Sequence, residues 1–191
     1  MKPFIKWVGG KTQIIDQVSE SFPRKFNNYH EIFIGGGSVL LHLLSNPDIV
    51  VIGTINAYDI NKTLIYVYKN IQLNCNELIE NIDSIMKKLN KMPLLEKGQG
   101  NKKPSDYVDT DQESFYYWTR KCFNKLSDEE KCSVYGSSLF IFLNKTCFRG
   151  LYRSGPNGFN VPFGHYKNPN VDVKNIKYIS KMIQCVNFEH A

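Results

Sequence analysis

The chain has 191 residues, enough for one domain or for a core domain with a smaller inserted lobe. Charged residues make up 22% of the chain and hydrophobic residues 42%, and no apolar run is long enough to span a bilayer or to form the core of a secretory signal. The net charge of +6 agrees with a polyanionic partner without requiring one.

The cysteines predict a reducing environment. They are scattered along the chain and form no CxxC pair, so we expect free thiols and neither a disulfide framework nor a zinc site. An intracellular protein is therefore expected, in the cytoplasm of a bacterium or inside a host cell if the source is viral. The five cysteines are Cys75, Cys122, Cys132, Cys147 and Cys185.

The N-terminal segment is mainly apolar up to the pair Gly9-Gly10, and apolar residues then recur at helical spacing through residue 18. Lys11 and Thr12 follow the two glycines as in a Walker P-loop, but the first glycine of GxxxxGK[ST] is missing, which argues against ATP hydrolysis. Trp7 is interpreted either as a core aromatic or as one wall of a ligand cavity.

Residues 29–44 predict a strand, a tight turn and a helix, because an apolar run ends in Gly35-Gly36-Gly37 and another begins directly afterwards. Glycines permit positive φ and let a ligand approach the backbone, while the free N–H groups of the helix point into the same space. Asp59 directly follows a second predicted strand, 52–58, and lies at the distance from the glycine turn where an acidic residue binds ribose hydroxyls. The glycine turn and Asp59 together indicate a nucleoside-type cofactor. The triple glycine lacks GxGxxG spacing, however, and can also be a flexible turn.

The middle of the chain predicts a helical lobe without assigned chemistry. We expect helices over 62–71 and from a cap at Asn76 to residue 89, and then a long exposed loop from Lys91 to Asp111. Further helices are expected over 114–126 and 134–143, separated by a capping box that begins at Ser127. The spacing of the aromatic residues here favours helix packing over base stacking.

Residues 144–167 predict a hairpin or a long finger around the turn Gly155-Pro156-Asn157-Gly158. A finger with arginine, asparagine, lysine and aromatic side chains can enter a DNA groove, where Asn160 can read adenine and Lys167 adds positive charge. The alternative is a solvated hairpin whose aromatic side chains pack on the lobe below. A short helix over 172–184 and a strand-like run from Cys185 follow.

Four blocks, in this order, resemble the Dam-type adenine-specific DNA methyltransferases, which transfer a methyl group from S-adenosylmethionine to the exocyclic amine of adenine. The corresponding family patterns are K-W-x-G-G-K, E-P-F-x-G-G-G, D-x-N and G-L-x-R…G-x-F-N-V-P-x-G-x-Y-K. The blocks are distributed over nearly the whole chain. They are Lys6 to Lys11, Glu31 to Gly37, Asp59-Ile60-Asn61, and Gly150 to Lys167, the last slightly shortened.

The resemblance implies a binding site for S-adenosylmethionine. Trp7, Lys11 and Asp59 would contact the cofactor, with Asp59 on the ribose hydroxyls. Phe33 and the glycines Gly35, Gly36 and Gly37 would shape the cavity around its methionine part. The product would be S-adenosylhomocysteine, and no metal is expected.

The resemblance also implies that the finger contacts double-stranded DNA. Arg153 would read a guanine in the major groove, and Pro162 would touch a thymine methyl group. Phe148 and Arg149 lie where the family wedges an aromatic side chain into the duplex or holds a phosphate. The expected target is a short palindrome with adenine next to guanine or thymine.

Two departures from the family pattern occur. Ile32 replaces the usual proline, which affects the stiffness of the turn and not the chemistry. The D-P-P-Y motif, whose acid and carbonyl accept hydrogen bonds from the target amine and whose aromatic ring stacks on the flipped base, is absent from the sequence. Asp106-Tyr107 and Asp109-Thr110-Asp111 lie in a polar loop, in the wrong context. We therefore assign no catalytic residue and expect the front part of an enzyme, with a second polypeptide as a further partner.

The predicted fold is α/β: a partial Rossmann-like S-adenosylmethionine-dependent methyltransferase sheet with an inserted, mostly helical DNA-recognition lobe carrying a hairpin. The sheet domain is expected over residues 1–75 plus 184–191, and the lobe over 76–183. The expected function is site-specific adenine-N6 methylation, as in restriction–modification, by a chain that is inactive or incomplete alone. The alternative is a non-catalytic DNA-binding or regulatory module, and a weaker one is a nicotinamide-dependent oxidoreductase. No membrane partner is expected.

Overall fold

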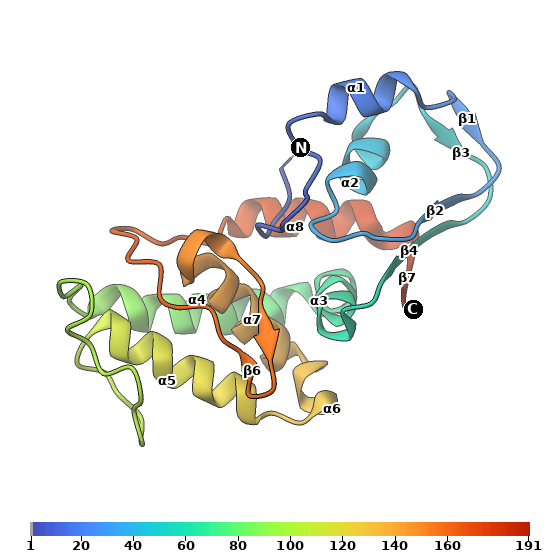
Figure 1. Cartoon of the computed structure of the whole chain (residues 1–191). Coiled ribbons are helices and arrows are strands. Elements are labelled where there is room, and N and C mark those ends of the chain that lie inside the picture. Colours follow the sequence, from blue (N-terminus) through green and yellow to red (C-terminus); the bar gives the residue numbers. More distant parts are fainter. Residues whose placement is uncertain (1) are drawn as a thin grey trace. The chain divides into compact units, whose positions relative to one another are not determined.

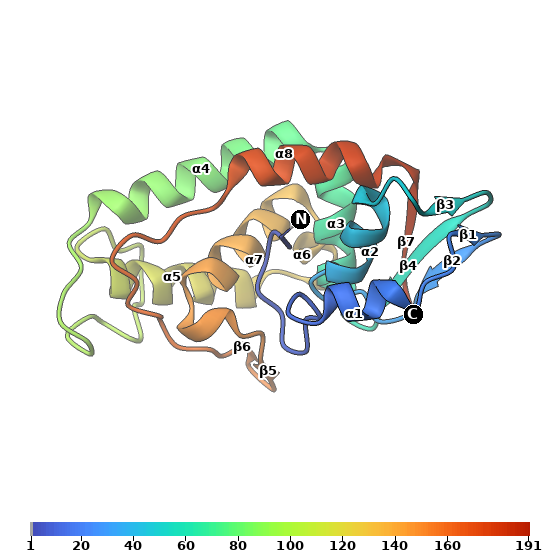
Figure 2. The same cartoon turned by 90° about the horizontal axis from the view of Figure 1, so that it is seen from above.

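The computed structural model describes residues 2–191 (Figures 1 and 2). The chain forms two compact units: unit 1 is Met1–Cys75 with Asp172–Ala191, and unit 2 is Asn76–Val171. Unit 1 is thus discontinuous in sequence, and its last segment begins at residue 172, earlier than the boundary at 184 that the sequence suggests. No helix within residues 2–191 is both long and apolar enough to cross a bilayer.

Unit 1 is built on parallel strands. A three-stranded sheet has the order β2-β4-β7, and a second parallel pair joins β1 to β3. Parallel neighbours require crossover connections, which α2 supplies between β2 and β4. The strands are β1 (Lys25–Phe26), β2 (Tyr29–Glu31), β3 (Val50–Val51), β4 (Ile55–Asp59) and β7 (Val186–His190).

Tyr68 of α3 is fully buried in the core of unit 1. The ring of Tyr68 lies 5.1 Å from the ring of Phe4 and 5.1 Å from that of Phe188 on β7. α8 packs against α2 and α3, which is why it belongs to unit 1. The predicted N-terminal helix forms, but it contributes no buried residue. The helices are α1 (Ile15–Glu20), α2 (Ser38–Ser45), α3 (Lys62–Leu73), α8 (Val173–Met182) and the 3₁₀ helix η2 (Ile183–Cys185).

Unit 2 is mostly helical, with one short antiparallel strand pair, β5 with β6. The prediction that Asn76 caps a helix was wrong: Asn74 ends α3 and α4 begins at the next residue, so Asn76 lies in the first turn of α4. The elements are α4 (Cys75–Lys91), α5 (Gln112–Lys125), α6 (Asp128–Lys131), α7 (Val134–Thr146), the 3₁₀ helix η1 (Phe148–Gly150), β5 (Ser154–Gly155) and β6 (Gly158–Phe159).

The capping box predicted at Ser127 is confirmed. Its hydroxyl oxygen accepts a hydrogen bond from the N–H of Glu130 at 3.2 Å, and the Glu130 carboxylate accepts one from the N–H of Ser127 at 2.7 Å. The two bonds satisfy backbone donors that a helix start leaves without partners.

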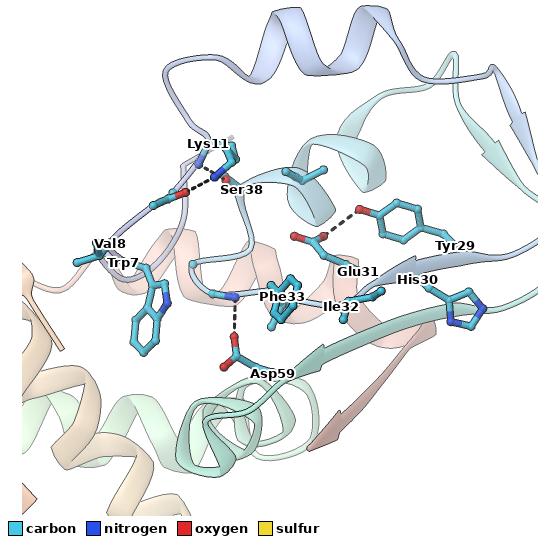
Figure 3. A pocket seen from close by; sticks show the side chains of 16 residues that line it. Trp7, Val8, Lys11, Tyr29, His30, Glu31, Ile32, Phe33, Ser38 and Asp59 are labelled. Carbon is cyan, nitrogen blue, oxygen red and sulfur yellow. Dashed lines mark hydrogen bonds between the residues drawn. The ribbon is translucent and has the colours of Figure 1, made fainter. Parts of the chain in front are cut away.

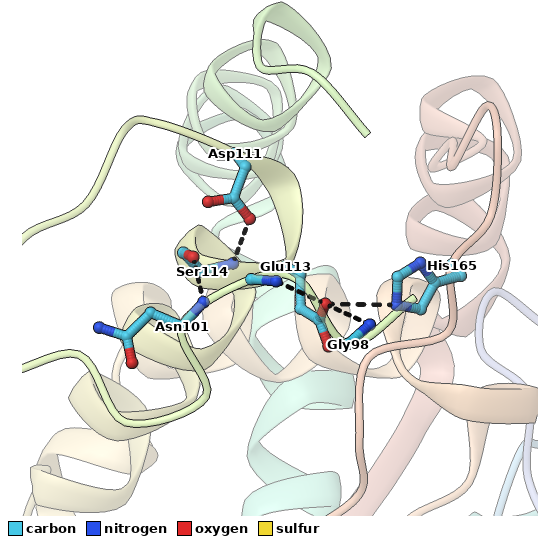
Figure 4. A network of polar contacts seen from close by, with 7 residues as sticks. Gly98, Asn101, Asp111, Glu113, Ser114 and His165 are labelled. Atoms are coloured by element: carbon cyan, nitrogen blue, oxygen red, sulfur yellow. Dashed lines mark hydrogen bonds and ion pairs between the residues drawn. The ribbon is translucent and has the colours of Figure 1, made fainter. Parts of the chain in front are cut away.

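The long connection between α4 and α5 has no regular structure, as predicted, but it is fastened to the start of α5 (Figure 4). The buried carboxylate of Glu113 accepts hydrogen bonds from the N–H groups of Gly98 and Gly100 at 3.0 and 3.1 Å. The Ser114 hydroxyl accepts one from Asn101 at 2.7 Å. His165 lies beside the same Glu113 carboxylate, with its Nε2 atom 3.6 Å away. The connection is therefore held in a defined path despite its exposure.

Candidate functional site

A cavity of about 700 Å³ opens in unit 1 at the carboxyl ends of β2 and β4 (Figure 3). In α/β sheets this is the edge where ligands bind. Of the seven predicted cofactor residues, six line the cavity: Trp7, Lys11, Phe33, Gly35, Gly36 and Asp59. The seventh, Gly37, lies behind the lining, where it forms the N-cap of α2.

The glycine turn needs residues without side chains for two separate reasons. Gly35 and Gly37 have φ of +49° and +74°, the left-handed region that favours glycine. A Cβ atom on Gly35 would lie 2.7 Å from Cδ1 of Trp7, and one on Gly37 would lie 2.5 Å from the hydroxyl of Tyr68. The turn thus packs closely against Trp7 in the cavity wall on one side and against Tyr68 in the core of unit 1 on the other.

Asp59 holds this turn while facing the cavity. Its Oδ2 atom accepts a hydrogen bond from the N–H of Gly35 at 3.0 Å, and its Oδ1 atom accepts one from the N–H of Asn61 at 2.9 Å. The side chain is nearly buried, with 8% of its surface exposed. Because each carboxylate oxygen can accept more than one hydrogen bond, Asp59 retains acceptor capacity for a ligand.

The N-terminal segment forms the opposite wall. The N–H of Lys11 donates to the hydroxyl of Ser38 at 3.0 Å, which ties the segment to the first residue of α2. The Lys11 ammonium donates to the carbonyl of Gly9 at 2.7 Å and stays in the cavity lining. Phe33 is 84% exposed, so its ring offers an apolar face to a bound molecule without serving the core.

In unit 2 the six predicted DNA-contacting side chains all lie on the surface: Phe148, Arg149, Arg153, Asn160, Pro162 and Lys167. The strand pair β5–β6 brings two of them together, since Nε of Arg153 donates to Oδ1 of Asn160 at 2.6 Å. A second contact joins Phe148 to Pro162, whose carbonyl accepts the Phe148 N–H at 2.8 Å. Lys167 lies outside these contacts.

Arg149 has an unusual backbone for a non-glycine residue, with φ of 57°. Its guanidinium carbon lies 5.2 Å from the centre of the exposed Phe148 ring. A residue held in the left-handed region costs free energy, so surrounding structure must fix it there. The result is an aromatic ring and a cation presented together at the surface of unit 2.

The sequence pattern that defines the D12 class N6 adenine-specific DNA methyltransferases matches residues 7–191 of this chain. The chain belongs to this methyltransferase family. The parallel α/β architecture of unit 1 is compatible with the S-adenosylmethionine-dependent methyltransferase fold predicted from the sequence.

Named relatives of this D12 methyltransferase chain come from an archaeon, a bacterium and a virus. The chain is 37% identical to the Type II methyltransferase M.MjaIII of Methanocaldococcus jannaschii, over 99% of this chain and 63% of that protein. It is 30% identical to a DNA adenine methylase of Haemophilus influenzae, over 98% and 55%, and 30% identical to the Type II methyltransferase M.CviBI of Paramecium bursaria Chlorella virus NC1A, over 93% and 56%. The chain thus spans little more than half the length of these relatives.

Glu31, to which the motifs of this D12 chain assign no role, lies in the cavity lining next to the start of α2. The hydroxyl of Tyr29 donates to Oε2 of Glu31 at 3.0 Å. Burial raises the pKa of the Glu31 carboxyl from 4.5 to about 7, against hydrogen bonds from Tyr29 and from the N–H of Leu40 that lower it. Only its position in the E-P-F-x-G-G-G block could have marked Glu31, because its burial depends on the tertiary structure.

One acid of the polar loop, Asp111, has a structural role in this D12 chain. Asp111 caps α5, where its carboxylate accepts a hydrogen bond from the N–H of Ser114 at 2.9 Å. Burial raises the pKa of Asp111, but hydrogen bonds from Ser114 and Thr110 outweigh it and hold that pKa below its usual value. Asp111 is therefore a structural cap that stays ionised.

Proposed function

We propose that these 191 residues carry the cofactor-binding and DNA-reading parts of a site-specific adenine-N6 DNA methyltransferase. The observation that supports the proposal most directly is the cavity of unit 1, where the glycine turn after β2 and Asp59 at the end of β4 meet. This juxtaposition offers bare backbone, helix N–H groups and a carboxylate to one ligand, and suits a nucleoside that carries a charged tail.

S-adenosylmethionine is the ligand that family membership favours for this cavity, and its sulfonium supplies the methyl group. The remaining acceptor capacity of Asp59 would bind the ribose hydroxyls. Phe33 and Trp7 would cover apolar parts of the cofactor, and Lys11 would face its carboxylate. Glu31 adds a negative charge to the lining when it ionises, which favours a cationic ligand.

Double-stranded DNA is the proposed substrate, read by the surface segment 148–167 of unit 2. Arg153 is held in place by Asn160, and an oriented guanidinium can contact the O6 and N7 atoms of guanine together. Phe148 and Arg149 present a ring and a cation that suit a disturbed base step and its phosphate. No residue of the printed sequence is assigned to the chemical step.

A second candidate function is sequence-specific DNA binding without methyl transfer. It is favoured by the exposed reading segment of unit 2, which needs no methyl donor to contact a duplex. The two candidates share the proposed cofactor and DNA sites and differ only in whether the methyl group is transferred.

The proposal predicts that the chain binds S-adenosylmethionine and S-adenosylhomocysteine, measured by isothermal titration calorimetry. Phe33→Ala should weaken binding about tenfold, because the lost aromatic contact is worth about 1.4 kcal/mol. Phe33 is exposed, so its removal should leave the fold intact; Leu73→Ala, at the exposed end of α3, is the matched control. Failure of the unsubstituted chain to bind either molecule at about 1 mM would contradict the proposal.

Methyl transfer from labelled S-adenosylmethionine to mixed-sequence duplex DNA then separates the two candidates. Label in adenine supports the methyltransferase and shows that a group of this chain positions the amine. Binding of cofactor and duplex without transfer fits both candidates, because no residue of this chain is assigned to the chemical step. Adding the part of a relative that this chain does not cover then decides: restored transfer supports the methyltransferase, and continued binding without transfer supports the DNA-binding module.

A further inference from the structure

Unit 2 contains a second cavity, of about 760 Å³, whose lining lies mostly outside the family motifs. Its walls are the segment 102–105, one face of α5, the end of α6 and the turn between β5 and β6. Among the residues that the structure describes, six cationic side chains line it and no acidic one does. The cationic residues are Lys102, Lys103, Arg120, Lys121, Lys125 and Lys131.

These charges are poorly compensated by the protein itself. Among the described residues only Lys131 has an acidic partner, the exposed Asp128 at 3.7 Å. Lys102, Lys103 and Lys125 are exposed and form no salt bridge with a described residue. Gathering like charges costs free energy that an anion can offset, so the cavity favours an anionic ligand.

The walls are fastened to α5 on both sides. On one side, the Lys121 ammonium donates to the carbonyls of Pro104 and Ser105 at 2.9 and 2.7 Å. On the other side, the Asn124 amide donates to the carbonyl of Phe159 at 2.9 Å and accepts its N–H at 2.8 Å. A Cβ atom on Gly158 would lie 2.6 Å from Oδ1 of Asn124, so the β5–β6 turn approaches α5 as closely as glycine allows. The cavity is thus built before any ligand arrives.

The cavity offers charge but no surface for a base. Tyr117 is buried, with 7% of its surface exposed, and the Arg120 guanidinium lies over its ring with its carbon 4.7 Å from the ring centre. Arg120 also donates to the carbonyl of Val161 at 3.0 Å, which fixes it in the wall. The lining therefore suits a ligand that is bound through its phosphates alone better than a free nucleotide, whose base would also need a contact.

We propose that this basic cavity holds backbone phosphates of the duplex beside the site that segment 148–167 reads. The inference rests on the proposed DNA-binding function, and its geometric support is the shared β5–β6 turn. That turn forms one wall of the cavity, and β5 begins directly after Arg153. Phosphates bound there add sequence-independent affinity and set the register of the reading segment.

The test is the salt dependence of binding to a mixed-sequence duplex of about 30 base pairs, followed by fluorescence anisotropy. K102Q/K125Q removes one exposed lysine from each of two walls and should lower the slope of log Kd against log salt by about 2. K102R/K125R should restore the slope. K87Q/K91Q, on α4, is the matched control: it removes two exposed lysines outside the cavity, and Lys91 lies in a last helical turn as Lys125 does.

A slope for K102Q/K125Q equal to that of K87Q/K91Q would overturn this inference alone. Lack of duplex binding by the unsubstituted chain would overturn the proposed DNA function and this inference together. Titration with inorganic phosphate separates a small-anion site from a duplex site. Phosphate binding that K102Q/K125Q abolishes, with the duplex slope unchanged, would overturn the assignment to duplex DNA.

Discussion

The carboxyl group of Glu31 lies between the hydroxyl of Tyr29 and the first turn of α2. Burial penalises its charged form, which is why its pKa rises to about 7. Below pH 4.5 the group is neutral in both folded and unfolded chains. Between 4.5 and about 7 the unfolded chain releases the proton while the folded chain keeps it, so stability falls as pH rises through this window.

Glu31→Gln should therefore stabilise the protein by an amount that grows from pH 4.5 to about 7 and is constant above it, reaching about 1–3 kcal/mol. Urea unfolding at several pH values measures this difference. Glu20→Gln, at an exposed position on α1, is the control. A stability difference between Glu31→Gln and the unsubstituted chain that does not change with pH would contradict the argument.

The β5–β6 pair shows how two short strands can position a functional side chain. Each strand has only two residues, yet their pairing brings the N–H of Asn160 to 3.0 Å from the carbonyl of Arg153. The side chains of Arg153 and Asn160 also form a hydrogen bond with each other. The pair is in turn held against α5 through Asn124. The guanidinium is therefore oriented by its element and by the neighbouring helix together.

Arg153→Ala should remove discrimination worth about 1–3 kcal/mol at one base pair while leaving most of the affinity for random duplex. Selection of bound duplexes from a random pool, followed by competition between single-base variants, measures both quantities. Lys87→Ala is the control for the loss of one positive charge in unit 2. An unchanged base preference would show that Arg153 does not read the sequence.

Unit 1 depends on residues from both ends of the chain. β7 pairs with β4 only after the chain has passed through unit 2, and the ring of Phe188 then stacks on that of Tyr68. The Tyr68 hydroxyl donates to the carbonyl of Gly35 at 2.9 Å. The C-terminal strand thus supports the turn that borders the cavity.

Phe188→Ala should lower the free energy of unfolding by about 3–5 kcal/mol, because it opens a cavity in the core. S-adenosylmethionine binding should weaken with it, since the support of Tyr68 is lost. Calorimetric unfolding and titration measure the two effects. Glu189→Ala, on the exposed face of the same strand, should change neither. If Phe188→Ala lowers the free energy of unfolding but leaves cofactor binding unaltered, the glycine turn does not depend on this part of the core.

The sequence by itself determined the features that depend on neighbouring residues. The strand, glycine turn and helix predicted over residues 29–44, the position of Asp59 at a strand end, and the capping box at Ser127 all follow from local backbone and hydrogen-bonding preferences. The order of the four motifs was also sufficient for the family, because a motif set in order is specific even without a structure.

Only the tertiary structure decided which distant residues meet. The Trp7 ring against Gly35, the Gln72 amide on the carbonyls of Ile183 and Val186, and the buried setting of Glu31 join segments far apart in the chain. The basic cavity of unit 2 is of the same kind, because its lysines come from a loop and two helices whose spacing carries no periodic signal. Burial and close approach are properties of the packed chain, and local sequence preferences do not encode them.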